Sequence, residues 1–308
     1  MASDPAAGPA PHPGASHLRL GVDLGGTKIA AALLGDYGRL VEQRRTPNPG
    51  DYDGLLVAIR DLCDGLVGRE VNLGIGMPGS ISPTTGLVRN ANSTYLNGKD
   101  FASDLAQATG RKVRLANDAN CFTLSEAFDG AASASPTVFG VIIGTGVGGG
   151  LTVNGELVHG AGGVAGEWGH IPLPWASADE HLAEPCWCGL RGCMEQWASG
   201  VAFERDYGRP GVRAPEIVDR ARGGETEAAA ALQRYISRLG RGLAVICNLF
   251  DPHTIVMGGG MSNVDELYDA LPAAMKPYLF TDQPANQIVR NRHGDASGVR
   301  GAAWLWPL

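Results

Sequence analysis

The sequence predicts an α/β fold built from two related lobes. Short apolar runs that stop at glycines indicate buried strands, and stretches with apolar residues at helical spacing follow them. Both patterns occur in two separate β-rich blocks of the chain, and no close internal repeat links the blocks. In folds of this kind a ligand lies in the crevice beyond the strand ends.

The individual elements are expected in the following order. Residues 18–26 alternate and then stop at glycines, so they predict a strand that ends in a tight turn and pairs with the next apolar run as a hairpin. The expected strands cover residues 18–26, 29–36, 71–80, 112–120, the hairpin at 137–158, and 253–262. The expected helices cover residues 51–68, 121–130, 225–250 and 300–306.

Composition excludes several classes of protein. The chain has 308 residues, 44% of them hydrophobic, which suits about two domains with a sizeable core. A net charge of −7 without a basic run argues against nucleic acid as a partner. No apolar stretch approaches the roughly 20 residues of a membrane helix. The Pro/Ala/Gly-rich residues 1–16 do not resemble a signal peptide, so we expect a flexible tail on a cytoplasmic protein with reduced cysteines.

Three glycine-rich turns follow apolar strands: "DLGGTK" (23–28), "GTGVGGG" (144–150) and "GGG" (258–260). Bare backbone N–H groups in such turns can line a phosphate. None matches the Walker A pattern, and the G-x-G-x-x-G at 144–150 lies inside a hairpin, which disfavours a nicotinamide-dependent oxidoreductase. Asp23 would repel a triphosphate unless Mg²⁺ lay between them. Thr27 and Lys28 can bind phosphate, although Lys28 can equally be a solvated turn lysine.

Two polar motifs indicate further chemistry. "LANDANC" places Asn117 and Asp118 at a strand end, where a carboxylate can accept the proton of a hydroxyl during phosphoryl transfer, or where the pair can cap the helix expected from Cys121. In "CWCGLRGCMEQ" (186–196) the cysteines are spaced C-x-C-x4-C. A redox pair prefers C-x-x-C, and a disulfide within the short C-x-C loop would be strained. A tetrahedral zinc would need a fourth ligand.

These motifs together resemble those of the ROK-family sugar kinases, which have a two-lobed actin-like ATPase (ribonuclease H-like) fold with a structural zinc site. The resemblance spans residues 18–306 and includes "GEWGH" (166–170), which has the pattern E-x-G-H. The cysteine motif beside E-x-G-H is the most specific part of the resemblance. It implies ATP, Mg²⁺ and a sugar as ligands, a structural Zn²⁺ and a homodimer. It also suggests a smaller lobe of residues 17–118 plus 291–308 and a larger lobe of residues 119–290 that carries the zinc motif.

The resemblance also assigns roles to individual residues. Asp118 is the expected catalytic base and sugar ligand, and Asn92 is an added candidate that an ordinary turn asparagine would also explain. The other expected sugar ligands are Asn117, Glu167, His170 and Glu195. The expected zinc ligands are His170, Cys186, Cys188 and Cys193, a closed set that leaves no position for water. The expected ATP-binding residues are Asp23, Gly25, Gly26, Thr27, Lys28, Gly144, Thr145, Gly146, Gly258, Gly259 and Gly260.

The substrate expected from this resemblance is D-fructose, with mannose as a further substrate. Segments such as "GEWGHIPLPW" and "HGDASGVRGAAWLWP" look most like the fructokinase branch, whose product is fructose 6-phosphate. The alternatives are an N-acetylglucosamine kinase, which shares "NDANCF" and "RHGDA", or a glucokinase. A non-catalytic sugar sensor is a weaker hypothesis, since it could dispense with Asp118. The family's repressors carry an added DNA-binding domain, for which the residues before the first expected strand are too few.

Overall fold

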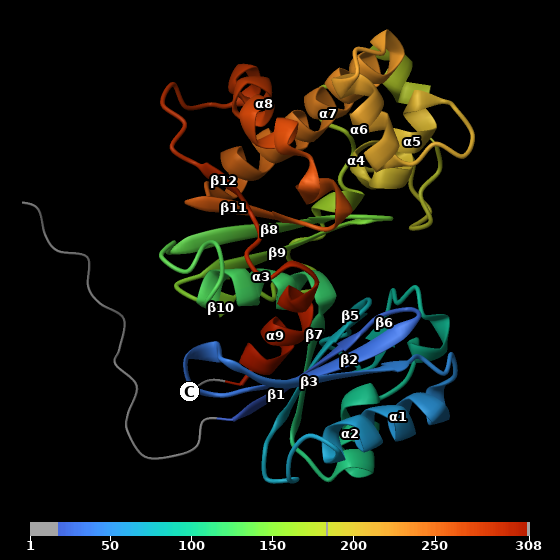
Figure 1. Cartoon of the computed structure of the whole chain (residues 1–308), viewed down its shortest axis with the longest axis vertical. Coiled ribbons are helices and arrows are strands. Elements are labelled where there is room, and N and C mark those ends of the chain that lie inside the picture. Colours follow the sequence, from blue (N-terminus) through green and yellow to red (C-terminus); the bar gives the residue numbers. More distant parts are fainter. Residues whose placement is uncertain (1–17, 183, 307–308) are drawn as a thin grey trace, which may run out of the picture.

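The computed structural model describes residues 18–182 and 184–306. Two five-stranded sheets, each with its own helices, lie one above the other and are joined through α3 (Asp118–Phe128) and α9 (Ser297–Trp304) (Figure 1). The tail expected at residues 1–16 lies outside the described residues. Within the described ranges, no helix has the length and apolar character needed to cross a membrane.

The first sheet combines a three-stranded meander with two parallel strands. β1 pairs antiparallel with β2 and parallel with β4, so that Val22 lies opposite both Ala31 and Ile75. Its strands, in spatial order, are β3 (Leu40–Pro47), β2 (Lys28–Leu34), β1 (Arg19–Leu24), β4 (Leu73–Met77) and β7 (Val113–Asn117). Its outer helices are α1 (Tyr52–Asp64) and α2 (Phe101–Thr109), and a small hairpin consists of β5 (Ser80–Ile81) and β6 (Val88–Arg89).

The second sheet repeats the same arrangement. β8 pairs antiparallel with β9 and parallel with β11, as β1 does with β2 and β4. Its strands, in spatial order, are β10 (Glu156–Leu157), β9 (Val147–Val153), β8 (Thr137–Ile143), β11 (Thr254–Gly258) and β12 (Gln287–Arg290). The predicted pair of related α/β lobes is therefore confirmed by strand order and direction.

Helices of the second lobe form its large apolar core. The long α7 (Thr226–Phe250) buries Leu239 and Leu243 among residues from β8, β11 and α8. The other helices are α4 (Glu195–Ala198), α5 (Gly200–Tyr207), α6 (Ala214–Arg222) and α8 (Asp265–Met275). Short 3-10 turns occupy Asp36–Gly38, Thr94–Leu96, Trp168–His170, Ala178–Leu182, Gly260–Asn263, Lys276–Tyr278 and Gly294–Ala296.

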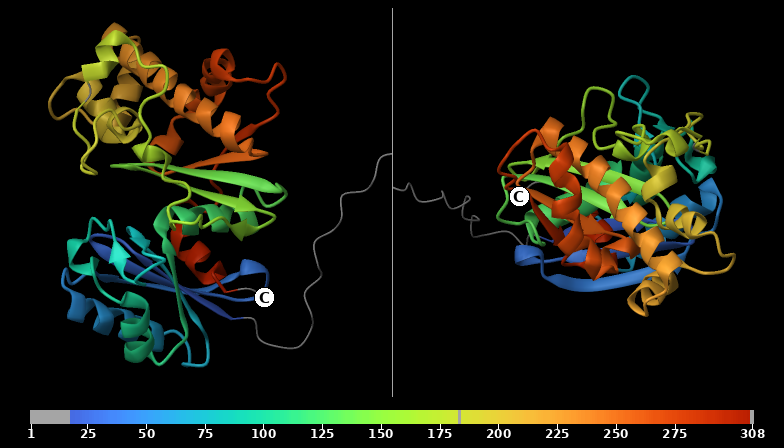
Figure 2. Two further views of the ribbon diagram at one scale, coloured as in Figure 1. Left: turned by 180° about the vertical axis from the view of Figure 1, so that it is seen from behind. Right: turned by 90° about the horizontal axis from the view of Figure 1, so that it is seen from above.

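The helices α3 and α9 pack against each other between the two sheets (Figure 2). Glycines allow this close approach, since a Cβ on Gly301 would overlap the backbone of Cys121, and one on Gly74 would overlap the backbone of Ala302. The start of α9 is held by Glu126, a fully buried carboxylate of α3 that accepts hydrogen bonds from the His293 backbone and other groups of residues 292–297. The two lobes are thus connected by a tightly packed helix pair.

Several elements differ from those predicted. Helix α3 begins at Asp118 instead of Cys121, because Asn117 accepts a hydrogen bond from the Ala119 N–H and caps it. β3 was not predicted, because this edge strand is largely exposed and its sequence "LVEQRRTP" is mostly polar. The division into lobes at residues 118 and 291 stays a prediction. Helix α3 packs against α9 and contacts strands of both sheets, while α9 packs against α3 and the first sheet, so the two helices tie the lobes together.

The segment between His170 and Cys186 is anchored on α7. Its Glu180 accepts hydrogen bonds from Arg238 (2.9 Å) and Arg241 (2.8 and 2.9 Å), and Arg241 also donates to the Trp175 carbonyl. Both arginine side chains are at least nine-tenths buried. Burial alone would raise the pKa of Glu180, but hydrogen bonds from Arg241, the Ser177 backbone and Arg238 lower it to about 2.

Replacing Glu180 with glutamine is expected to lower the free energy of unfolding at pH 7 by about 3 kcal/mol, because two buried guanidinium groups lose a charged partner. Glu180 has its pKa below the ordinary value of 4.5, so its stabilisation is present above that pH and is lost as the pH falls toward 2. Urea denaturation measures both effects. The control is Glu227→Gln, whose side chain is exposed and 3.6 Å from Arg209, with an expected loss of at most about 1 kcal/mol. Equal losses in both variants would contradict the anchoring role.

Candidate active site

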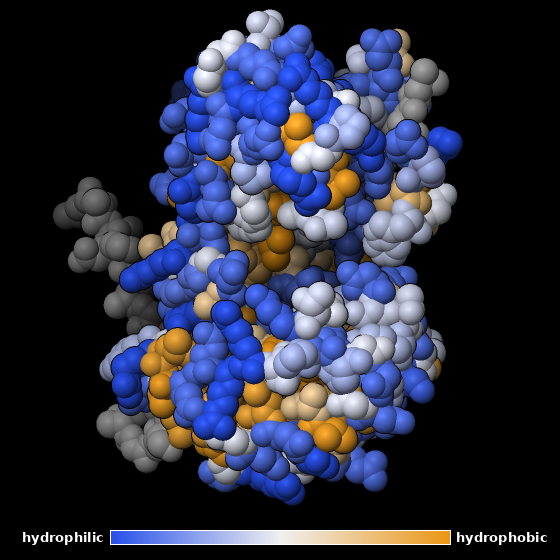
Figure 3. Space-filling model, turned by 45° about the vertical axis from the view of Figure 1, so that its right-hand side comes forward, coloured by the Kyte–Doolittle hydropathy of each residue, from blue (hydrophilic) through white to orange (hydrophobic). Residues whose placement is uncertain are grey.

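The carboxyl ends of the parallel strands in both sheets meet the space between the lobes, where the molecular surface narrows (Figure 3). Asp23 lies at the end of β1 and Asp118 directly follows β7. From the second lobe, Gly144 follows β8 and Gly259 follows β11. This placement brings the predicted catalytic and glycine-turn residues to the same cleft.

Asp118 and Asn117 lie at the start of α3, where some of their polar atoms already form hydrogen bonds within the protein. The Asp118 carboxylate accepts a hydrogen bond from the Ala119 N–H at 2.9 Å, and the residue keeps part of its surface exposed. Surrounding protein displaces water and raises its pKa, while hydrogen bonds from Ala119 and Asn117 oppose this shift. The Asn117 amide donates to the Gly79 carbonyl at 3.1 Å, and its oxygen, which accepts the Ala119 N–H, retains a second lone pair for a ligand. Asn117 is therefore a helix cap that retains capacity for a sugar hydroxyl.

Asp23 is close enough to Asp118 for the two charges to interact. Burial, and then the charge of Asp118, raise the pKa of Asp23 to about 6, although Lys28 lowers it. The following turn is closed by a 3.0 Å hydrogen bond from the Gly25 N–H to the Lys28 carbonyl, and Gly26, Thr27 and Lys28 are exposed. Asn48 holds the turn from outside, because its amide donates to the Gly25 carbonyl at 2.8 Å. No motif in the sequence pointed to Asn48, which lies on a separate loop.

Replacing Asp23 with asparagine is expected to stabilise the ligand-free protein at pH 7 by about 2–3 kcal/mol. The pKa of the Asp23 carboxyl is raised from 3.8 to about 6 in the folded protein. Below pH 3.8 the carboxyl is protonated and its burial favours folding, but this stabilisation is lost as the pH rises through 6 and the buried group becomes charged. Asparagine carries no charge, so the substitution stabilises the protein only where Asp23 would be ionised. The gain should therefore vanish near pH 4. Urea denaturation at both pH values tests this, and a gain of the same size at pH 4 and pH 7 would contradict it.

Glu167, His170 and Glu195 approach the same cleft from the second lobe. Burial raises the pKa of Glu167, His170 opposes this, and the charges of Asp118 and Glu195 raise it further. Glu195 is held at both oxygens, since Oε2 accepts from the Val147 N–H at 3.1 Å and Oε1 accepts from Trp187 at 2.8 Å. The structure thus gathers carboxylates from both lobes around one space.

Asn92 makes fewer contacts within the protein than the other predicted sugar ligands. It lies exposed in the loop after β6, whose shape is set by hydrogen bonds between Asn97 and the Ala91 backbone. Among the residues that the structure describes, none hydrogen-bonds to the Asn92 side chain. Its predicted contact with a sugar hydroxyl stays a prediction.

The four predicted metal ligands form one cluster. Their ligand atoms, the three cysteine sulfurs and a ring nitrogen of His170, all lie within 4.8 Å of one another. Tetrahedral Zn–S bonds of about 2.3 Å place two sulfurs about 3.8 Å apart and a sulfur and a nitrogen about 3.6 Å apart. The observed separations are 3.7 Å between the Cys188 and Cys193 sulfurs and 3.6 Å between the Cys186 sulfur and His170 Nδ1. The donor set fits zinc, with Nδ1 toward the metal and Nε2 left for another partner.

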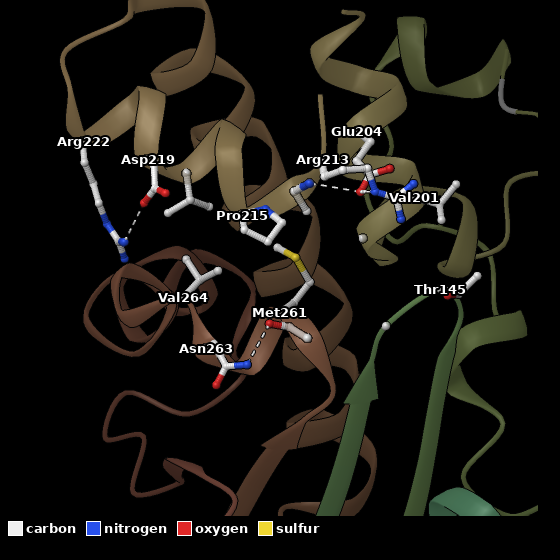
Figure 4. Close-up of a pocket in the computed structure, with 15 residues that line it drawn as sticks. Thr145, Val201, Glu204, Arg213, Pro215, Asp219, Arg222, Met261, Asn263 and Val264 are labelled. Atoms are coloured by element: carbon white, nitrogen blue, oxygen red, sulfur yellow. Dashed lines mark hydrogen bonds and ion pairs between the residues drawn. The ribbon is translucent and has the colours of Figure 1, made fainter. Parts of the chain in front are cut away.

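A pocket of about 380 Å³ lies beside the glycine turns of the second lobe (Figure 4). The predicted Gly144, Thr145 and Gly260 line one side. Helices α5 and α6 and the turn after β11 supply apolar walls, which the sequence did not predict: Val201, Pro215, Val218, Met261 and Val264. An apolar slot next to glycine-rich turns suits a flat heterocycle such as adenine.

The predicted glycines of the third turn have different roles. Gly258 is buried, and a Cβ there would overlap the ring of Phe122, so it serves packing. Gly259 has φ +79°, and a side chain there would meet the Ile143 carbonyl. Gly260 is exposed at the pocket with free space around its Cα. This turn therefore combines one packing glycine, one glycine with a left-handed backbone conformation and one that lines the pocket.

Proteins of known sequence show close similarity to this chain. The family model described as ROK family matches residues 19–308. The N-acetyl-D-glucosamine kinase of Pectobacterium atrosepticum is 42% identical over 296 residues, covering 92% of this chain and 97% of that protein. The enzyme of the same name from Yersinia enterocolitica is 39% identical over 296 residues, with 92% and 98% covered.

Solved structures agree with this similarity. A ROK hexokinase from Thermus thermophilus superimposes with a TM-score of 0.81 at 33% identity, covering 93% of this chain and 96% of that chain. A ROK family glucokinase from Streptomyces griseus, solved with glucose and AMPPNP, has a TM-score of 0.76 at 30% identity, with 94% and 98% covered.

Proposed function

The chain belongs to the ROK family and has its two-lobed actin-like ATPase fold, and from this we propose that it is an ATP-dependent kinase of N-acetyl-D-glucosamine. The observation that carries the proposal is the meeting of Asp118 with Glu167, His170 and Glu195 in a cleft bordered by glycine turns. These groups come from both lobes, and such a set of fixed acceptors and donors suits a ligand with many hydroxyls.

The proposed reaction transfers the γ-phosphoryl group of ATP to the 6-hydroxyl of the sugar. Asp118 accepts the hydroxyl proton as the sugar oxygen bonds to the γ-phosphorus and the bond to the β-phosphate oxygen breaks, which releases ADP. The raised pKa of Asp118 makes its carboxylate a stronger proton acceptor than an ordinary surface aspartate. Asn117, Glu167, His170 and Glu195 would hold the sugar so that this hydroxyl faces Asp118.

ATP would lie across the second-lobe pocket and both phosphate turns. The apolar walls formed by α5 and α6 would take the adenine, while the backbone N–H groups of the turns at residues 25–28 and 144–146 would bind phosphates. Mg²⁺ bound with the triphosphate would supply the positive charge that permits phosphates beside Asp23. Closure of the lobes would exclude water, which otherwise accepts the phosphoryl group.

His170, Cys186, Cys188 and Cys193 would hold a structural zinc ion in this proposal. Binding by Nδ1 would fix the tautomer and direction of the His170 ring, so that Nε2 faces the sugar. The role of the metal would then be to shape the wall that carries His170 and Glu195. A homodimer in the cytoplasm completes the proposal, and a reducing compartment suits the six cysteines, none of which forms a disulfide among the described residues.

The relatives favour N-acetylglucosamine over the fructose predicted from the sequence. Those reported above with 42% and 39% identity are named for that sugar. Fructose stays the second candidate on the motif resemblance, and glucose is a third because the Streptomyces glucokinase structure was solved with it. The segments "NDANCF" and "RHGDA" are shared by the N-acetylglucosamine kinase and fructokinase branches, so they do not distinguish between these two sugars.

A coupled assay of ADP release tests the proposal over N-acetylglucosamine, fructose, glucose, mannose and N-acetylmannosamine. We expect the highest kcat/KM with N-acetylglucosamine. A higher value with fructose would return the assignment to the fructokinase branch. Sugar binding without release of ADP for any of them would instead identify a non-catalytic sensor.

A further inference from the structure

Trp187 is an exposed indole placed among the proposed sugar ligands. It stands between Cys186 and Cys188 and keeps 63% of its surface exposed. Its Nε1–H donates to Glu195 Oε1 at 2.8 Å, and its ring meets that of His170 edge to face, with 5.0 Å between centroids. Nothing in the zinc motif itself requires an aromatic residue at this position.

The hydrogen bond from Trp187 helps to fix the orientation in which Glu195 can bind a ligand. The Val147 N–H already holds Glu195 Oε2, and the indole N–H holds Oε1, so the carboxylate cannot rotate without losing a hydrogen bond. Each carboxylate oxygen accepts about two hydrogen bonds, so each retains capacity for a sugar hydroxyl. Trp187 therefore orients Glu195 without occupying it fully.

The indole contacts both Glu195 and His170. A pyranose bound to His170 and Glu195 would cover the exposed indole surface, because the indole touches each of them. Pyranoses carry hydroxyls at their edges and C–H groups on their faces, so an aromatic wall complements a polar rim. On the basis of the proposed function, we propose that Trp187 is a sugar-positioning residue that orients Glu195 and packs against the apolar face of the sugar.

The test compares Trp187→Phe and Trp187→Leu with Trp175→Phe. Trp175 is a matched control because it is also exposed, at 53%, and its ring packs against Tyr278, away from the sugar ligands. Phenylalanine at position 187 keeps a ring but removes the donor to a charged group, so we expect the KM for N-acetylglucosamine to rise about tenfold. The KM for ATP should stay unchanged, and Trp187→Leu should raise the sugar KM further. Trp175→Phe should behave as the parent does.

Tryptophan fluorescence gives a second measurement that does not depend on turnover. Titration with N-acetylglucosamine should change the emission of the parent and of Trp175→Phe, and the change should be lost in Trp187→Phe. An unaltered sugar KM and an unaltered fluorescence change in Trp187→Phe would overturn the proposal. A raised KM accompanied by loss of bound zinc would also overturn it, because Trp187 would then act only through the metal site. A Trp187-dependent fluorescence change in a parent that releases no ADP would support this inference while rejecting the kinase assignment.

Discussion

Replacing Asp118 with asparagine is expected to lower kcat by about 10²–10⁴-fold, the usual contribution of a general base. Asparagine has nearly the same shape and can still accept the Ala119 N–H bond that Asp118 accepts at the start of α3. It cannot accept the proton of the sugar hydroxyl. Sugar affinity should survive, because the proposed sugar ligands Glu167, His170 and Glu195 would hold the sugar from the other lobe. Steady-state kinetics and calorimetric titration with sugar measure the two quantities.

The control for Asp118 is the same substitution at another helix start. Asp51 caps α1 by accepting the Gly54 N–H at 2.8 Å, away from the cleft. Asp51→Asn should retain both turnover and sugar binding. Near-normal kcat in Asp118→Asn would reject Asp118 as the base. Loss of sugar binding in the same proportion as kcat would assign it to sugar positioning alone.

Loss of the metal site is the second change with a large expected effect. Protein purified without chelator should carry about one zinc per chain, and Cys186→Ser should carry far less. Because His170 belongs to the metal cluster and Glu195 lies two residues after Cys193, we expect the sugar KM of Cys186→Ser to rise about 10–100-fold. Elemental analysis and kinetics measure the two effects.

The order in which a chelator weakens sugar binding and unfolds the chain shows whether the zinc supports only the sugar site or the whole fold. Sugar binding should weaken at chelator concentrations that leave the main unfolding transition intact, because the large core of α7 and α8 contains no metal ligand. Cys247→Ser removes a buried thiol of α7 and should leave the zinc content unchanged. The zinc assignment would be rejected by metal-free protein with full sugar affinity.

Local signals in the sequence explain which parts of this structure were predictable. The turn that begins at Gly144 joins β8 to β9, two strands that are neighbours in the chain and pair with each other, so the local pattern of apolar runs around glycines predicts it. Residues whose role depends on tertiary contacts were missed. Asn48 supports the Gly25 turn from a distant loop, and Trp187 gains its meaning only beside His170 and Glu195. Neither belongs to a pattern that spacing alone can reveal.

The apolar pocket of the second lobe was missed for a related reason. Val218 and its neighbours on α6 follow ordinary helical spacing, which predicts a face toward the core but not a face toward a ligand. The edge strands β3 and β12 were missed because exposed strands need few apolar residues. The choice of sugar is the hardest to predict, because it depends on small differences around a shared set of hydrogen-bonding groups.

The position of α9 between the sheets also affects how the chain folds during translation. α9 covers the inner face of β1, β2 and β4, yet the ribosome delivers it only after the whole second lobe. The nascent first sheet therefore carries an uncovered apolar face through most of synthesis, when it is open to chaperones and to aggregation. Folding of the first lobe can be completed only when residues 297–304 emerge, so the lobe synthesised first becomes stable last.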